Sequence, residues 1–255
     1  MSISATRGAY RAVCCVAFLA VAAAVIGILV VAAGHHRPEL TDEQRFARAR
    51  QRMVEEDLRG RSITDKRVLE VMGRIGRQEF VPAAQRRRAY DDRPLAIGHG
   101  QTISQPYIVA SMTQAVRPKP DSRALDVGTG SGYQAAVLAE LCKKVYSIEI
   151  VRPLADDATQ RLKRLGYENV TVRHGDGYRG WPQHAPFDVI IVAAAPDHVP
   201  QPLVDQLAPG GRLVIPVGRH YQDLLLFEKQ PDGTVQRRNL GGVAFVPMTG
   251  EAEVK

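Results

Sequence analysis

The sequence predicts an α/β protein built around a doubly wound, parallel β-sheet. From Arg123 onward, short apolar segments alternate with stretches of helical spacing, which is typical of consecutive βαβ units. A helical subdomain precedes this core, and the C-terminal segment carries short strand-like runs on either side of a Pro-Asp-Gly turn. We therefore expect an N-terminal apolar segment, a helical subdomain, an α/β core and a small β extension, at residues 1–34, 35–118, 119–230 and 231–255.

Chain size and charge limit the classes of function. A chain of 255 residues holds one sizeable α/β domain with appendages. Its net charge of +7 and pI of about 9.5 would suit a protein that binds nucleic acid or a membrane surface. The excess is mostly arginine within residues 37–93 and is interleaved with acidic residues, and no aromatic residues alternate with these arginines to form a base-stacking platform. We interpret these arginines as solvated helix faces and expect no nucleic-acid partner.

An apolar run spans residues 12–33 and contains no charged side chain. At about 1.5 Å per residue, a helix of this length crosses the hydrocarbon core of a bilayer. A membrane anchor is the first interpretation, and a signal peptide cleaved between Ala33 and Gly34 is the alternative. More arginines follow the run than precede it, which by the positive-inside rule places the C-terminal side in the cytoplasm. The expected location is cytoplasmic with a tether to the inner membrane, or periplasmic or secreted if a signal is cleaved.

The predicted helical subdomain has two start signals. Residues 41–44, Thr-Asp-Glu-Gln, resemble a capping box and open a charged helix that runs to about Leu58. A second start signal, Thr64-Asp65, precedes Val68, Leu69 and Met72, whose three- and four-residue spacing marks an apolar helix face.

The remaining elements follow in order along the chain. Residues 91–103 are rich in Gly and Pro and predict a loop or short hairpin, and residues 105–116 predict a helix whose first turn tolerates Pro106. Apolar runs predict core strands at 124–127, 145–148, 170–173, 188–192 and 212–217, with helices at 133–141 and 153–165. Three tail strands are expected at 224–227, 234–238 and 243–246.

The most informative motif is residues 125–133, Leu-Asp-Val-Gly-Thr-Gly-Ser-Gly-Tyr, between the first core strand and its helix. Glycines here let the backbone approach a ligand closely. The G-x-G-x-G spacing differs from that of dinucleotide sites and resembles the turn shared by S-adenosylmethionine-dependent methyltransferases. This cofactor has no pyrophosphate to seat on a helix N-terminus, and its cationic groups suit a nearby carboxylate. The residues expected to contact the cofactor are Asp126, Gly128, Thr129, Gly130 and Gly132.

Acidic residues follow the next two strands. Glu149 ends the second strand, where a carboxylate is able to accept hydrogen bonds from both ribose hydroxyls. Gly175 and Asp176 follow the third strand, and the Asp176 carboxylate is expected to reach the adenine amino group. A plain turn is the alternative interpretation of Asp176.

The segment after the fourth strand limits the methyl acceptor. Amine and nucleobase methyltransferases of this kind often carry Asn/Asp-Pro-Pro-Tyr/Phe there, whereas residues 193–196 are Ala-Ala-Ala-Pro. No acidic or amide cluster suggests Mg²⁺, and the three cysteines have no metal or disulfide spacing, so no metal is expected. A carboxylate acceptor is already ionised near neutrality and needs no general base. Positioning and exclusion of water then suffice, which fits the shortage of obvious catalytic bases.

Four longer segments carry a more specific resemblance. They are Gly98–Tyr107 (GHGQTISQPY), Arg173–Gly177 (RHGDG), Ala185–Val192 (APFDVIIV) and Leu207–Gly218 (LAPGGRLVIPVG). With them the chain resembles the protein-L-isoaspartate O-methyltransferase family from about residue 50 to Met248, and T-I-S-x-P is the family's own signature. The resemblance implies a Rossmann-like methyltransferase sheet, S-adenosyl-L-methionine as cofactor, and isoaspartyl-containing proteins and peptides as partners. We expect a monomer.

The resemblance also implies the reaction. The methyl group goes to the free α-carboxylate of an L-isoaspartyl residue in a damaged protein, and the ester closes to a succinimide whose hydrolysis returns some normal linkage. Ser104 corresponds to the family's active-site residue and would orient the carboxylate. Thr102 and Ile103 would lie against the cofactor.

Two residues depart from the pattern of bacterial members. Ala193 stands where Thr is frequent, and Ala244 stands where Arg often precedes Phe-Val-Pro in the C-terminal wall of the peptide site. Two alternatives stay open: a methyltransferase acting on RNA or a small molecule, and a membrane-tethered binder of isoaspartyl peptides without turnover. The T-I-S-x-P segment and the missing amine-binding motif favour the isoaspartyl enzyme.

Overall fold

The computed structural model describes residues 40–253, and their core is a seven-stranded β-sheet. The strand order is β5-β4-β3-β6-β7-β8-β9, with parallel pairing from β5 to β7 and antiparallel pairing from β7 to β9. The predicted doubly wound sheet is confirmed, and two tail strands complete the same sheet. The strands are β3 (Arg123–Val127), β4 (Lys144–Glu149), β5 (Val170–His174), β6 (Phe187–Val192), β7 (Leu207–Val217), β8 (Gln222–Lys229) and β9 (Val235–Val243).

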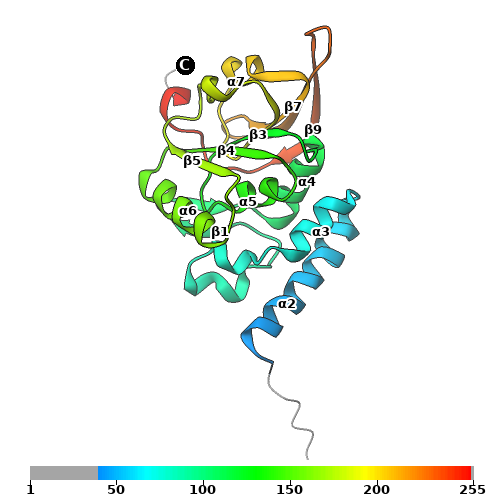
Figure 1. Ribbon diagram of the computed structural model, residues 1–255, viewed down its shortest axis with the longest axis vertical. Coiled ribbons are helices and arrows are strands. Elements are labelled where there is room, and N and C mark those ends of the chain that lie inside the picture. The colour runs from blue at the N-terminus through cyan, green and yellow to red at the C-terminus, as the bar shows by residue number, and fades with distance from the viewer. Residues whose placement is uncertain (1–39, 254–255) are drawn as a thin grey trace, which may run out of the picture. The chain divides into compact units, whose positions relative to one another are not determined.

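Helices cover both faces of this sheet (Figure 1). They are α4 (Pro106–Val116), α5 (Tyr133–Ala139), α6 (Arg152–Arg164) and α7 (Gln201–Asp205). The first three lie on one face, and α7 lies on the other. Because strand side chains alternate between faces, Val145 and Val189 enter the core beneath α4 to α6, whereas Leu125 and Ile190 enter the core beneath α7.

The topology fixes where a ligand is able to bind. The chain runs outward from β3 to β4 and β5, and then places β6 on the other side of β3. This reversal leaves a crevice at the carboxyl ends of β3 and β6, the usual ligand position in open α/β sheets. The loops after all the parallel strands meet at this edge, which is where the predicted site residues are expected to converge.

The first described helix is shorter than predicted. α2 (Asp42–Arg52) buries none of its residues, and the chain continues as a π-helical turn over Met53–Leu58. The charged stretch is therefore α-helical only as far as Arg52. At the turn, Met53, Val54 and Leu58 become buried in the core.

The second helix begins where the sequence predicts. α3 (Lys66–Arg74) follows Asp65, whose carboxylate accepts hydrogen bonds from the amides of Arg67 at 2.9 Å and Val68 at 3.4 Å. The short hairpin is also present, as β1 (Leu95–Gly98) paired antiparallel with β2 (Gln101–Ile103).

The expected third tail strand at 243–246 is wrong. β9 already reaches Val243, and the following residues leave the sheet. Pro247, which has no N–H to donate to a ladder, instead makes an isolated bridge with Ala195 after β6. The C-terminal segment is thereby carried back to the edge of the sheet where the ligand crevice lies.

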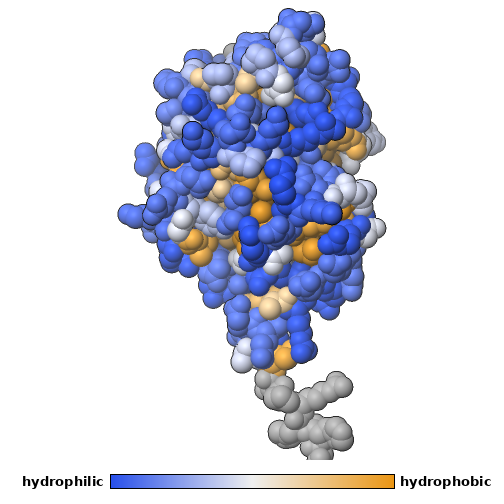
Figure 2. Space-filling model, turned by 45° about the vertical axis from the view of Figure 1, so that its right-hand side comes forward, coloured by the Kyte–Doolittle hydropathy of each residue, from blue (hydrophilic) through white to orange (hydrophobic). Residues whose placement is uncertain are grey.

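Residues 12–33, for which a membrane anchor is predicted, lie outside the described residues. Within residues 40–253, no helix is both long enough and apolar enough to span a membrane. Figure 2 shows one face of the molecule, on which hydrophilic side chains predominate and apolar surface is confined to small patches.

Candidate active site

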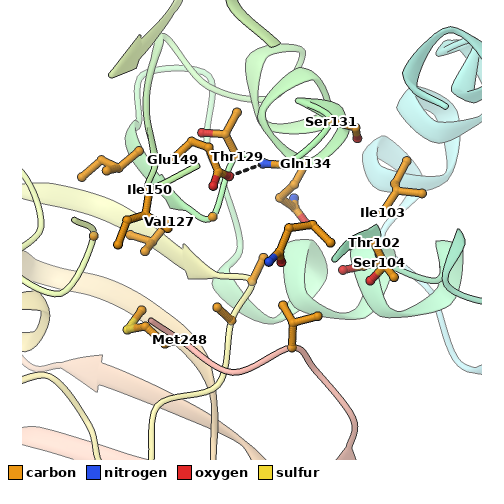
Figure 3. Close-up of a pocket in the computed structure, with 18 of the residues that line it drawn as sticks. Thr102, Ile103, Ser104, Val127, Thr129, Ser131, Gln134, Glu149, Ile150 and Met248 are labelled. Atoms are coloured by element: carbon orange, nitrogen blue, oxygen red, sulfur yellow. Dashed lines mark hydrogen bonds between the residues drawn. The ribbon is translucent and has the colours of Figure 1, made fainter. Parts of the chain in front are cut away.

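A cleft opens at the carboxyl ends of β3, β4 and β6, where the topology predicts a ligand (Figure 3). We name it the glycine-turn cleft. It is lined by Gln101–Ser104, Val109, Met112, Val127–Ser131, Tyr133, Gln134, Ile148–Ile150, Gly177, Ala193, Ala194 and Val246–Thr249. The predicted site residues that line it are Thr102, Ile103, Ser104, Gly128, Thr129, Gly130 and Glu149.

The glycine turn is held against the end of β4 by its own backbone. The amides of Gly128 and Thr129 both donate to the Ile148 carbonyl, at 2.8 and 3.1 Å. Gly130 has a φ of 52°, and a Cβ there would lie 3.3 Å from the side chain of Ile97 in the β1–β2 hairpin. A side chain at this position would crowd Ile97 and strain the left-handed backbone, so glycine suits this close approach of the hairpin.

Glu149 is 5% exposed and faces the cleft from the end of β4. One carboxylate oxygen accepts the amide of Gly130 at 2.7 Å, shown as a dashed line in Figure 3, and the other accepts the amide of Val151 at 2.9 Å. Each oxygen retains a further lone pair. Glu149 therefore both fixes the turn and presents acceptors to whatever occupies the cleft.

Asp126 does not line the cleft, contrary to the expectation of a direct cofactor contact. It is fully buried on the opposite face of β3 from Val127, because adjacent strand residues face opposite ways. Its carboxylate accepts the Ser147 hydroxyl at 2.7 Å, and that hydroxyl oxygen lies 2.5 Å from the Thr129 hydroxyl. Burial raises the pKa of Asp126 to about 7, which weakens its case as a fixed negative charge. Asp126 reaches the cleft through Ser147 and Thr129.

Three other predicted residues also lie outside the lining. Gly132, with a φ of 87°, starts α5 and lets Leu162 of α6 pack against it. The amide of Gly175 donates to the Glu149 carbonyl at 2.9 Å. Both Asp176 carboxylate oxygens accept backbone amides, from Tyr178 and Glu251 at 2.8 Å each, which fits the turn interpretation better than contact with an adenine. From this part of the chain, Gly177 lines the cleft instead.

A C-terminal strap, residues 246–253, closes one side of the cleft. Two backbone hydrogen bonds hold the strap to Ala195: the Ala195 amide donates to the Val246 carbonyl, and the Ala195 carbonyl accepts the Met248 amide. Farther along, Glu251 pairs with Arg179 and is capped by Asp176. The sequence pattern placed residues 245–247 in the wall of the peptide site but did not assign the strap to the glycine-turn cleft.

A second hollow, the outer cleft, adjoins the first. The two share Thr102, Ser104, Ala193 and Val246. Ser104 therefore lies at the junction, and no hydrogen bond joins its hydroxyl to another residue in the described part of the chain. The other residues of the outer cleft are Arg61, Pro94, Gln105, Tyr107, Ile108, His220–Asp223 and Gly242–Phe245. Ala193 and Ala244, the two departures, both line it, while the loop 220–223 carried no motif by which sequence could have found it.

Arg77 fixes the backbone of Ser104 from below. Its side chain is fully buried, and its guanidinium donates to the carbonyl of Ser104 at 2.6 Å and to that of Ala89 at 2.7 Å. The same group lies over the ring of Tyr133, 4.7 Å from its centre, and Tyr133 lines the glycine-turn cleft. Arginine is rarely buried without a carboxylate, because burying its charge costs free energy. The hydrogen bonds to the two carbonyls and the contact with Tyr133 offset part of that cost. Arg77 therefore links the backbone of Ser104 to Tyr133 in the wall of the glycine-turn cleft.

Asp92 holds the same segment from the other side. Its carboxylate accepts the amide of Tyr107 at 3.0 Å and the side-chain amide of Gln105 at 2.6 Å. Gln105 supplies no side-chain cap to α4, so Asp92 caps this helix from a distant loop. Ser104 thus sits between two anchors, Arg77 and Asp92, which sequence patterns alone did not indicate.

The sheet order, the glycine-rich turn after β3 and the carboxylate at the end of β4 together define the class of S-adenosylmethionine-dependent methyltransferases. Within that class, residues 48–253 match the family described as protein-L-isoaspartate(D-aspartate) O-methyltransferase. The chain belongs to this family.

Individual relatives agree with the family match. A protein-L-isoaspartate O-methyltransferase 2 of Syntrophobacter fumaroxidans is 55% identical over 235 residues, which cover 89% of this chain and 95% of that protein. Its counterpart in a Polaromonas species is 59% identical over 194 residues, covering 75% and 92%.

Solved structures agree as well. A protein-L-isoaspartate O-methyltransferase structure has a TM-score of 0.72 at 30% identity, covering 80% of this chain and 67% of that one. A Plasmodium falciparum protein of the same description, solved with S-adenosyl-L-homocysteine, has a TM-score of 0.68 at 29% identity, covering 78% and 98%.

The first prediction concerns Glu149. Glu149→Ala is expected to weaken S-adenosylmethionine binding by about 1–3 kcal/mol, because charged hydrogen-bond acceptors are lost from the cleft. Glu149→Gln keeps one acceptor oxygen and should lose less. Isothermal titration calorimetry measures the affinity, with Glu140→Ala, a surface partner of Arg74, as control. Unchanged affinity in both Glu149 variants would remove this residue from the cofactor site.

The second prediction concerns Arg77. Arg77→Met leaves the carbonyls of Ala89 and Ser104 unsatisfied, so we expect at least a tenfold loss of kcat and a fall of about 1–3 kcal/mol in the free energy of unfolding. Arg77→Lys, which reaches one carbonyl, should recover part of the kcat. Arg88→Met, an exposed neighbour, is the control. Loss of stability with an unchanged kcat at a temperature where the variant is folded would contradict a positioning role.

Proposed function

We propose that this chain transfers the methyl group of S-adenosylmethionine to the free α-carboxylate of L-isoaspartyl residues in damaged proteins and peptides. The observation that carries the proposal is the meeting of two clefts at Ser104. One cleft has the glycine turn and carboxylate typical of cofactor sites in this class, and the other is open to a polypeptide. The relatives described above, which bear the isoaspartate methyltransferase name over most of this chain, support the same assignment.

The lining of the glycine-turn cleft fits the cofactor. Glu149 retains lone pairs for ribose hydroxyls, and the turn at Gly128–Gly130 leaves no side chain between backbone and ligand. Val127 and Met248 supply apolar surface on either side (Figure 3). Thr102 and Ile103 complete the wall next to Ser104. When bound, the cofactor supplies an electrophilic methyl group on a cationic sulfur.

The protein's part in the reaction is to position and desolvate the acceptor. The isoaspartyl carboxylate is ionised at neutral pH, so no residue needs to remove a proton. The Ser104 hydroxyl, which has no partner within the described residues, donates a hydrogen bond to one carboxylate oxygen and aims the other toward the first cleft. Because opposite charges neutralise one another as the methyl moves, exclusion of water from the junction favours the transfer. Closure of the ester to a succinimide needs no further residue.

The third prediction tests this function. The wild-type chain is expected to methylate an isoaspartyl peptide and to leave the matching aspartyl peptide unmodified. The free carboxylate of an isoaspartyl residue is attached directly to Cα, whereas that of an aspartyl residue lies one CH₂ group farther from the backbone. Ser104→Ala should lower kcat while cofactor affinity stays near wild type. Transfer of labelled methyl groups and calorimetry give the two quantities.

Three outcomes would count against the proposal. Equal methylation of both peptides would overturn the substrate assignment. Binding of the isoaspartyl peptide without transfer would favour a binder without turnover. Methylation of RNA but of neither peptide would favour the nucleic-acid alternative.

We also propose that the enzyme acts as a monomer in the cytoplasm, tethered through residues 12–33. S-adenosylmethionine is made and kept in the cytosol, so a catalytic domain on that side of the membrane has access to it. The arginines that follow the apolar run favour the same side of the membrane.

The fourth prediction follows from this topology. Alkaline phosphatase fused after Lys255 should be inactive, because that enzyme folds only after export, whereas a fluorescent protein at the same site should fluoresce at the membrane. Strong phosphatase activity, or a mature protein that begins at Gly34, would falsify the cytoplasmic assignment.

A further inference from the structure

The outer cleft continues into a second groove, which we name the basic trough. Tyr107 lines both hollows, and residues close in sequence line one or the other. Arg61 lines the outer cleft and Ser62 the trough; likewise Gly242 lines the outer cleft and Leu240 the trough. The trough therefore prolongs the outer cleft between α4 and β9. Its floor includes Leu226 of β8, which is paired with Arg238 of β9.

Three cations in the trough have no carboxylate partner within residues 40–253. Two other arginines of the lining are engaged, since Arg67 pairs with Asp65 at 3.4 Å and Arg212 with Glu228 at 2.7 Å. The unpaired cations are Arg117, Lys119 and Arg238, all exposed. They come from both walls, so their charges converge on the same space.

The cations lie at the far end of the trough from Ser104. Arg117 is the left-handed residue that ends α4, and Lys119 follows it. α4 rises about 1.5 Å per residue, so Tyr107 and Arg117 are separated by about 15 Å along the helix. Along β9, Val243 and Arg238 are separated by about 17 Å. An extended peptide covers this distance in about four or five residues.

We propose that the basic trough binds an acidic stretch of the same polypeptide whose isoaspartyl residue occupies the outer cleft. The inference rests on the proposed function and adds a substrate preference to it: damaged chains with Asp or Glu about four to six residues from the isoaspartyl residue, on one side of it. Such residues would reach Arg117, Lys119 and Arg238.

A polypeptide suits the trough better than a nucleic acid. Among the lining residues Tyr107 is the only aromatic one, and the Arg61 guanidinium covers one face of its ring at 3.9 Å, so the trough has no series of aromatic rings on which successive bases could stack. Leu226 and Leu240 provide apolar surface along which aliphatic side chains can pack. The continuity with the outer cleft also places the occupant on the acceptor molecule itself.

The test uses the full chain and peptides with one isoaspartyl residue in a Gly/Ser background. A Glu-Glu pair is moved outward, position by position, on either side up to about eight residues away, with Gln-Gln at each position as control. We expect KM to fall by about threefold to tenfold at a separation of about four to six residues on one side, with kcat unchanged. The effect should fade in high salt.

The variant R117Q/K119Q/R238Q should abolish the dependence on the Glu-Glu pair and leave the KM of the Gln-Gln peptides unchanged. The control R86Q/R87Q/R88Q removes the same charge from an exposed turn elsewhere and should retain the dependence. A KM that is independent of the position of the pair, or a dependence that persists in the trough variant, would overturn the inference. So would a trough variant that loses binding of a short RNA but keeps the peptide preference. If no isoaspartyl peptide is methylated at all, the proposed function itself fails.

Discussion

The Arg77 guanidinium donates to the carbonyls of Ser104 and Ala89 from a position without exposed surface, and the junction of the two clefts depends on this contact. Few side chains could replace it, because one planar group must satisfy two backbone oxygens about 2.7 Å away while stacking on Tyr133. Burial opposes the charge and lowers the pKa of Arg77, so the surrounding carbonyls and ring are what retain it. The backbone at Ser104 is therefore anchored by the protein's own contacts, as a site that works by orientation requires.

The pleat of the sheet places two carboxyl groups near the glycine turn, those of Glu149 and Asp126, in different surroundings. Glu149 ends β4 and meets the cleft directly, with both oxygens engaged by backbone amides. The Asp126 side chain is buried on the other face of β3 from Val127, and burial raises its pKa to about 7. The Ser147 hydroxyl connects it to Thr129. The two hydrogen bonds connect Asp126 to the floor of the cleft, whereas Glu149 faces the cleft itself.

The sequence predicted the parts of the site that depend on contiguous residues. The glycine turn, Glu149 and the segment 102–104 were found because strand, turn and helix follow one another locally, and a parallel sheet brings their ends to one edge. The buried position of Asp126 was not predictable, because a motif shows adjacency along the chain but not which face of the strand a residue occupies. The contacts of Arg77 with Ser104 and of Asp176 with Glu251 join residues 27 and 75 positions apart, and no local pattern encodes such pairs. For the same reason the loop 220–223 and the role of the C-terminal strap emerged only from the fold.

We propose above that Ser104 presents the acceptor carboxylate to the glycine-turn cleft. A crystal structure of the enzyme with S-adenosylhomocysteine and an isoaspartyl peptide tests it most directly. We expect the cofactor product against Glu149 and the peptide α-carboxylate within hydrogen-bonding distance, about 2.5–3.0 Å, of the Ser104 hydroxyl, with its other oxygen toward the sulfur. A peptide whose carboxylate is bound elsewhere, with Ser104 contacting neither ligand, would contradict the proposed role of Ser104.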